Sequence, residues 1–216
     1  MSPANFVQAD LRFLLPIQAN QQVAIWGYIP ELVEAISDAQ AHCTLILPLT
    51  QPAAAAEGPY DQVLLKDKSL PLAQASMDHV FIPQLATTEA SWLINEVKRV
   101  LKPGGWLFIG VRNRFSLYQM GFKQKQRYAL TLGKLQHLFA LPEWEIKQCY
   151  GVHEDLQSPQ FLISLANPET ARYFYDQIFM PHSQTGAWAQ RLALRLSKMG
   201  GQRFLFRDLG LVAQHF

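Results

Sequence analysis

The amino-acid sequence predicts an α/β protein with a Rossmann-like, doubly wound, mostly parallel seven-stranded sheet and helices on both faces. Two observations carry this prediction. Short and continuous apolar segments, such as residues 106–111, have the composition of strands that are buried on both faces of a parallel sheet. These segments alternate with amphipathic stretches, and a repeated strand–helix–strand order favours right-handed parallel crossovers.

The elements of the first half follow one another at short intervals. Strands are expected at 22–27, 42–49, 61–65, 76–83 and 106–111, and helices at 30–36 and 86–102. The first helix has Pro30 in its first turn and Glu31 near its positive end, as is typical of helix N-termini. The second helix meets Lys102-Pro103-Gly104-Gly105, where proline cannot continue a helix and glycine allows a left-handed turn.

The second half continues the pattern and then becomes helical. We expect a helix over 131–139 capped by Thr131, strands over 144–152 and 159–165, and a helix over 168–179 capped by Asn167. A basic amphipathic helix over 187–199 precedes an apolar ending. The predicted organisation is a covering segment (1–20), a Rossmann-like domain (21–166) and a C-terminal helical extension packed on that domain (167–216).

The composition is that of a folded protein. The chain has 216 residues, of which 49% are hydrophobic and 12% aromatic, which is enough for one domain with a sizeable core. No apolar run reaches the roughly 18 residues that span a bilayer, and no secretory signal is recognisable. Cys43 and Cys149 make neither a disulfide framework nor a metal site. We expect a cytoplasmic protein that binds no metal.

The charge is unevenly distributed along the chain. Residues 1–96 hold three Lys or Arg against ten Asp or Glu, whereas residues 97–216 hold sixteen against seven. A basic stretch, residues 98–134, contains no acidic residue. It could bind an anionic ligand, nucleic acid or an acidic partner, or it could pair with the acidic half of its own fold.

Three short motifs carry a resemblance to a known family. Leu70-Pro71-Leu72 precedes Ser76-Met77-Asp78-His79-Val80, the segment from Glu96 to Gly105 contains Arg-Val-Leu and Lys-Pro-Gly-Gly, and Thr131-x-x-x-Leu135-x-x-Leu138 precedes a predicted strand. In this order they resemble class I S-adenosylmethionine-dependent methyltransferases, over roughly residues 20–165. The resemblance implies the fold predicted above and S-adenosylmethionine as cofactor.

The resemblance places the cofactor at the turn after the first strand. There the family has an acidic residue followed by Gly-x-Gly-x-Gly, whose glycines let the backbone approach the cofactor. In this chain only Gly27 matches, Ile25 stands at the acidic position, and Ile29 and Glu31 replace the second and third glycines. The end of the second strand, residues 45–50, also lacks the acid that would hold the ribose.

Candidate site residues follow from this alignment and from the sheet edge. The candidate cofactor contacts are Gly27, Tyr28, Asp67 and Pro83. Arg112, Asn113 and Arg114 follow the fifth strand, at the edge where open α/β sheets bind ligands, and form the candidate anion- or substrate-binding site. No nucleophile, metal or amino-methyltransferase signature is present, so no catalytic residue is predicted.

The favoured functional hypothesis is a non-catalytic methyltransferase-like protein. It would be a partner or ligand-binding subunit in a biosynthetic or RNA-modifying system, acting with a protein partner or as a homo-oligomer. The alternative is an active methyltransferase with an atypical S-adenosylmethionine pocket that acts on a small or anionic substrate. A weaker alternative is a nucleic-acid-binding module that uses residues 98–134.

Overall fold

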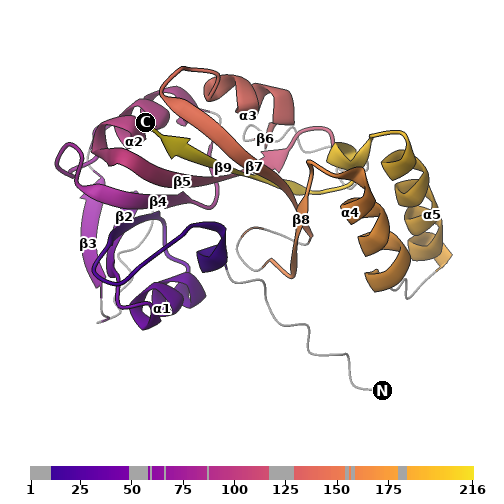
Figure 1. Ribbon diagram of the computed structural model, residues 1–216, viewed down its shortest axis with the longest axis horizontal. Coiled ribbons are helices and arrows are strands. Elements are labelled where there is room, and N and C mark those ends of the chain that lie inside the picture. Colours follow the sequence, from indigo (N-terminus) through magenta and orange to yellow (C-terminus); the bar gives the residue numbers. More distant parts are fainter. Residues whose placement is uncertain are drawn as a thin grey trace.

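The computed structural model describes residues 11–48, 58, 60–65, 67–86, 88–116, 129–153, 156, 159–179 and 184–216. Within these residues nine strands form one sheet, in the order β3-β2-β1-β4-β5-β9-β7-β8, with β6 paired to β5 (Figure 1). The strands are β1 (Gln22–Trp26), β2 (His42–Pro48), β3 (Tyr60–Leu65), β4 (Met77–Ile82), β5 (Leu101–Asn113), β6 (Ala129–Leu130), β7 (Trp144–His153), β8 (Phe161–Ser164) and β9 (Asp208–His215). The helical segments are η1 (Leu11–Leu14), α1 (Pro30–Asp38), α2 (Ala90–Val100), α3 (Leu132–Leu138), α4 (Pro168–Tyr173), the π-helical η3 (Phe174–Ile178), α5 (Gln184–Lys198) and η4 (Gln202–Phe204).

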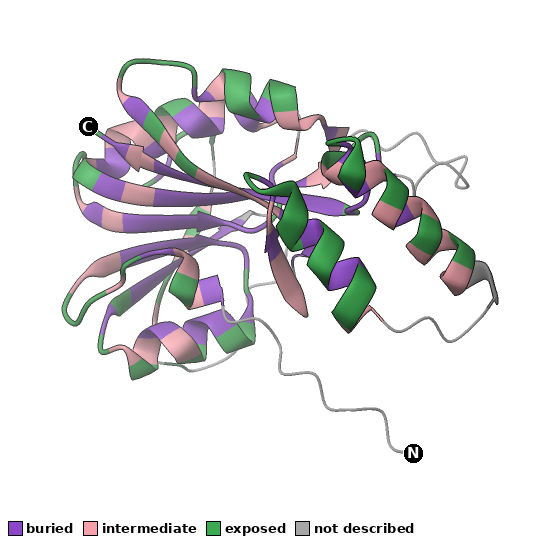
Figure 2. Cartoon of the chain, turned by 45° about the vertical axis from the view of Figure 1, so that its right-hand side comes forward, coloured by how far each residue is buried: buried purple, intermediate pink, exposed green. Residues whose placement is uncertain are grey.

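The first five strands form the predicted parallel, doubly wound half of the sheet. β1 lies between β2 and β4, and α1 and α2 make the crossovers. Alternate residues of β1 face opposite layers, because side chains of a strand point to the two faces in turn. Val23 and Ile25 pack with α1, whereas Ala24 and Trp26 pack with the layer that contains α2 and α3. The burial pattern of the strands and helices agrees with this two-layer covering (Figure 2).

The C-terminal strand corrects the expected helical extension over 167–216 and the expected count of seven strands. β9 inserts between β5 and β7 and is antiparallel to both. All of its residues are buried except the half-buried Gln214. The exposed Phe216 follows the strand. Its apolar run was visible in the sequence, but its place in the sheet depends on pairing with β5 about 100 residues earlier, which no local pattern reveals.

The helices that precede β9 pack beside the sheet. α4 and α5 lie side by side beyond β8 (Figure 1), and the predicted single helix over 168–179 changes from α to π geometry at Phe174. Gln190 of α5 donates to the carbonyl oxygens of Tyr175 (2.6 Å) and Phe179 (3.2 Å).

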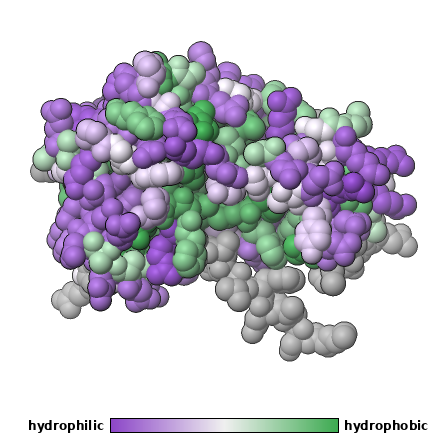
Figure 3. Space-filling view, viewed as in Figure 1, coloured by the Kyte–Doolittle hydropathy of each residue, from purple (hydrophilic) through white to green (hydrophobic). Residues whose placement is uncertain are grey.

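No helix among the described residues is long and apolar enough to cross a membrane. In the same view as Figure 1, hydrophobic residues gather near the middle of the molecule and hydrophilic ones cover both ends (Figure 3).

The Lys-Pro-Gly-Gly junction lies inside a strand rather than between two elements. α2 ends at Val100 and β5 begins directly at Leu101, where the sequence predicts a helix to Lys102 and a strand from Trp106. The pairing of β4 with β5 shifts register between Met77–Leu101 and His79–Trp106, so extra residues of β5 bulge out. Gly104 has a φ of 82°, which glycine adopts without steric cost.

Candidate functional site

The turn after β1 keeps a single glycine in a left-handed conformation. Gly27 has a φ of 86°, and its amide donates a hydrogen bond to the carbonyl oxygen of Ile46 at the end of β2 (2.9 Å). Tyr28 is 38% exposed, and its ring centroid lies 6.1 Å from that of Tyr60. Ile29 has extended backbone geometry and is 7% exposed, because its side chain packs into the layer of α1. The turn therefore directs one of its side chains into the core.

The residues at the end of β1 are also core residues. Ile25, at the position of the expected carboxylate, is fully buried in the layer of α1. Trp26 points to the other face and makes an edge-on contact with Trp92 of α2, with ring centroids 6.0 Å apart. Neither side chain offers a hydrogen-bond acceptor for a cofactor hydroxyl group.

The candidate cofactor contacts do not all come together. Gly27 and Pro83 follow β1 and β4, which are adjacent parallel strands, so they lie at the same edge of the sheet. Pro83 is buried. Asp67 is exposed and follows β3, which is separated from β1 by β2. Residues 49 and 50, part of the predicted ribose-binding end of the second strand, lie outside the described residues.

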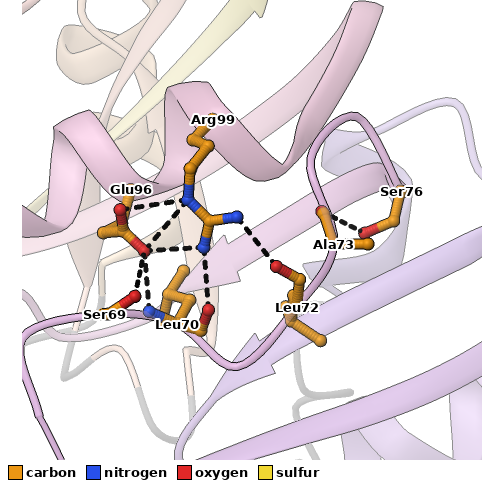
Figure 4. Close-up of polar contacts among 7 residues, drawn as sticks. All are labelled: Ser69, Leu70, Leu72, Ala73, Ser76, Glu96 and Arg99. Atoms are coloured by element: carbon orange, nitrogen blue, oxygen red, sulfur yellow. Dashed lines mark hydrogen bonds and ion pairs between the residues drawn. The ribbon is translucent and has the colours of Figure 1, made fainter.

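The methyltransferase motif Arg-Val-Leu holds the loop that leads into β4 (Figure 4). Arg99 donates to the carbonyl oxygens of Leu70 (2.8 Å) and Leu72 (2.9 Å) and to the Glu96 carboxylate (2.7 Å). Glu96 accepts from the amide of Leu70 (2.7 Å), and the hydrogen bond from Arg99 is the main cause that lowers the pKa of Glu96. The motif is thus a backbone clamp rather than a catalytic group.

The lysine of the Lys-Pro-Gly-Gly motif pairs with the aspartate of the β4 motif. Lys102 Nζ lies 2.8 Å from both carboxylate oxygens of Asp78, which also accepts from the amide of Gln22 at the start of β1 (2.9 Å). Burial alone would raise the pKa of Asp78, but the Gln22 amide and Lys102 together lower it. These contacts tie β1, β4 and β5 together at their amino ends.

His79, the next residue, is expected to make the protein less stable in mild acid. It is 2% exposed, its Nε2 lies 2.7 Å from Gln21 Oε1, and burial lowers its pKa to about 4. Between pH 6.5 and 4 this histidine is protonated in the unfolded chain but neutral in the folded protein. The free energy of unfolding therefore falls as the pH falls. The loss from pH 7 to pH 5 should be about 2 kcal/mol.

Urea unfolding at pH 7, 6 and 5 measures this contribution. A His79→Gln variant keeps a hydrogen-bonding side chain without the titration, so the stability of the variant should change less over this pH range. Identical slopes for the two proteins would show that His79 does not titrate abnormally.

Two of the three residues of the predicted anion site after β5 make internal contacts. Arg112 Nε lies 3.2 Å from the buried carboxylate of Asp208, its partner across β9. The Asn113 side chain donates to the carbonyl oxygens of Arg203 (2.7 Å) and Phe206 (2.9 Å). Only Arg114 of the three is exposed. Arg112 and Asn113 therefore join β5 to the segment before β9.

Internal pairing extends to other cations of the basic stretch. Four of its basic side chains, in the described part of residues 98–134, form ion pairs: Lys98 with Glu143, Arg99 with Glu96, Lys102 with Asp78 and Arg112 with Asp208. Arg114 and Lys134 are exposed, and residues 117–128 lie outside the description. This favours the interpretation that much of the basic stretch pairs with acidic residues of its own fold.

A pocket of about 190 Å³ lies at the carboxyl end of β5. It is lined by Asn113, Phe115, Thr131, Leu132, Gly133, Arg203 and Phe204. Sequence reasoning found Asn113 but missed the other side chains, because η4 reaches β5 only through the long-range pairing of β9. The repeated Arg-Phe pair at 114–115 and 203–204 was the one local signal.

The strand order and the crossovers define the fold of class I S-adenosylmethionine-dependent methyltransferases. Residues 34–109 match the sequence model of the family described as a methyltransferase domain, and fold and match together confirm the resemblance to this family. A comparison with curated proteins finds no match.

Solved structures with the same fold differ in what they are described as doing. The chain is similar to a structure of the complex between the Haloferax volcanii Trm112 methyltransferase activator and a putative methyltransferase, with 13% identity, 95% of this chain and 88% of that one covered, and a TM-score of 0.62. It is also similar to the structure of the [4+2]-cyclase SpnF, with 17% identity and a TM-score of 0.58. The match covers 92% of this chain and 76% of that one. A structure of an S-adenosylmethionine-dependent methyltransferase from Archaeoglobus fulgidus has 14% identity and a TM-score of 0.57, and the match covers 94% of this chain and 90% of that one. Identities this low show a shared fold alone.

Proposed function

We propose that this protein is methyltransferase-like but has a degraded S-adenosylmethionine site, and that it acts as a non-catalytic partner or ligand-binding subunit in a biosynthetic or RNA-modifying system. The observation that carries the proposal is the turn after β1. Ile29 takes the place of the second glycine of the family and is 7% exposed in the core. A glycine there would leave the backbone open to a ligand, whereas Ile29 is part of the packing of α1.

The residues around the turn do not fit the cofactor in the manner of the family. Ile25 and Ile29 are apolar and buried where the family has an acid and a glycine. Hydroxyl groups of a bound ribose need acceptors, and binding without them would leave polar groups unpaired, at a cost of about 1–3 kcal/mol each. Asp67, the one candidate acid, lies two strands away from β1.

The comparisons show the fold but do not assign an activity to this chain. One protein of this fold is described as a [4+2]-cyclase, and one structure of this fold is a complex with an activator protein. A fold of this class therefore hosts several activities and assemblies, and function must be argued from the site.

Calorimetric titration with S-adenosylmethionine tests the proposal. We expect no binding at cofactor concentrations up to about 1 mM, that is, a binding free energy weaker than about −4 kcal/mol. S-adenosylhomocysteine, titrated in parallel, should behave in the same way.

Micromolar binding would overturn the proposal and favour the alternative, an active methyltransferase with an atypical pocket. In that case a Tyr28→Ala variant should weaken binding, since Tyr28 is the half-exposed side chain of the turn. An Arg191→Ala variant on α5, remote from the turn, serves as the control that should bind as the parent does.

A further inference from the structure

The pocket at the end of β5 has walls from three separate segments. Residues 113–115 come from the end of β5, residues 131–133 from the start of α3, and residues 203–204 from η4. This pocket is distinct from the turn after β1, because β4 lies between β1 and β5. It can therefore bind a ligand whether or not that turn holds a cofactor.

Two phenylalanine rings form an apolar wall that the protein leaves open. Phe115 is 53% exposed, although it is a large hydrophobic side chain. Its ring meets that of Phe204 edge-on, with centroids 6.3 Å apart. An aromatic ligand could add a third ring to this pair, since such pairs are worth about 0.5–1.5 kcal/mol beyond the area they bury.

Basic residues outnumber acidic ones around this wall. The three segments 111–116, 129–134 and 201–207 contain five Lys or Arg residues and no Asp or Glu. Arg112 is paired with Asp208, but the Arg203 guanidinium lies 4.9 Å from the Phe204 ring centroid and has no carboxylate partner among the described residues. A cation beside an aromatic wall suits a ligand that combines a ring with an anionic group.

The walls are held in place before any ligand binds. The side chain of Asn113 is 2% exposed, donates to the carbonyl oxygens of Arg203 and Phe206, and accepts from the amide of Phe115 (3.2 Å). One residue thus fixes the backbone on both sides of the pocket. At Gly133 an added Cβ would meet nothing within 4 Å, so this wall borders open space. Such preorganisation lowers the entropic cost of binding.

We infer that this pocket binds a small aromatic anion, a single ring that carries a carboxylate or phosphate group. Its volume of about 190 Å³ corresponds to about six water molecules in the liquid, which matches one ring with one anionic substituent. The ring packs against Phe115 and Phe204, and the anionic group meets Arg203. This inference rests on the proposed function, since it names a ligand class for the binding role.

Phenyl phosphate and benzoate are the probes for this site, measured by calorimetry on the full chain. Phenyl phosphate should bind at least about tenfold more tightly than inorganic phosphate or benzyl alcohol, because each of these lacks one of the two recognition elements. Arg203→Ala should weaken binding by about tenfold through loss of a charge-assisted contact. Gly133→Leu, which fills the pocket and leaves the charges in place, should abolish binding.

Arg191→Ala removes an exposed arginine elsewhere and should leave the affinity unchanged, and thermal melts check that each variant is folded. Equal affinity for phenyl phosphate and inorganic phosphate, no binding at about 10 mM probe, or full binding by Gly133→Leu would each overturn the inference. The titration with S-adenosylmethionine decides the proposed function independently, because a protein that binds the cofactor could still bind or reject phenyl phosphate.

Discussion

Replacement of Gly110 by alanine is expected to lower the free energy of unfolding by about 3 kcal/mol, since an added methyl group would have to displace packed backbone. Gly110 lies toward the carboxyl end of β5, opposite Gly210 of β9. Its carbonyl oxygen accepts from the amide of Leu85, so the loop after β4 runs directly against it (2.8 Å). A Cβ at this position would lie 2.2 Å from the carbonyl oxygen of Pro83 and 2.6 Å from Leu156 Cδ1.

The close approach at Gly110 concerns the loop between β4 and α2 as well as the stability of the fold. The backbone of Pro83 cannot move without shifting the loop between β4 and α2, which borders the carboxyl edge of the sheet. We expect the variant to unfold at a lower urea concentration than the parent, with an unchanged dependence on urea if the folded state stays compact.

Gly133→Ala is the matched control for this prediction. Nothing lies within 4 Å of its added Cβ, and the residue is in a helix, where alanine is favoured over glycine by up to about 1 kcal/mol. The control should be as stable as the parent or more stable. If Gly110→Ala also unfolds within about 0.5 kcal/mol of the parent, the close contact with Pro83 is not a constraint on the fold.

The parallel half of the fold was predictable because its signals are local. Each of its strands is a short apolar run, and each crossover helix carries its own stop or start signal, such as Pro30 in the first turn of α1. The caps Thr131 and Asn167 are confirmed, since each side chain accepts a hydrogen bond from a first-turn amide of its helix. Their geometry depends only on residues two or three positions away.

The centre of the sheet and the pocket at the end of β5 were not predictable, because they depend on long-range pairing. β9 reaches its place by pairing with β5 and β7, and Arg112 meets Asp208 only through that pairing. A sequence pattern shows that Arg112 is basic and follows a strand, but it does not show which carboxylate will stand beside it. The sequence therefore predicts the anion site at Arg112, Asn113 and Arg114, whereas the exposed cationic side chain that lines the pocket is Arg203.

Replacement of Arg99 by alanine is expected to cost about 2 kcal/mol, because the variant removes the arginine that donates to two backbone carbonyl groups and to a carboxylate. Arg99 binds the carbonyl oxygens of Leu70 and Leu72 together with Glu96, in the clamp of Figure 4. The side chains of Arg99 and Glu96 are 33% and 18% exposed, so water can replace part of what is lost. Arg99→Lys should recover only part of the stability, since lysine lacks the planar fork that reaches several acceptors at once.

The pair of Glu169 and Arg172 in α4 provides the control for this clamp. It has the same spacing of three residues, but its side chains are 70% and 47% exposed and their closest atoms lie 3.3 Å apart. Arg172→Ala should change the free energy of unfolding by less than about 0.5 kcal/mol.

Hydrogen exchange distinguishes a local clamp from a general loss of stability. The amide of Leu70 donates to Glu96, so its exchange should accelerate in Arg99→Ala more than the exchange of the β1 amides does. Equal acceleration of both would mean that Arg99 acts only through global stability. An Arg99→Ala variant no less stable than Arg172→Ala would show that the methyltransferase motif does not hold the loop before β4.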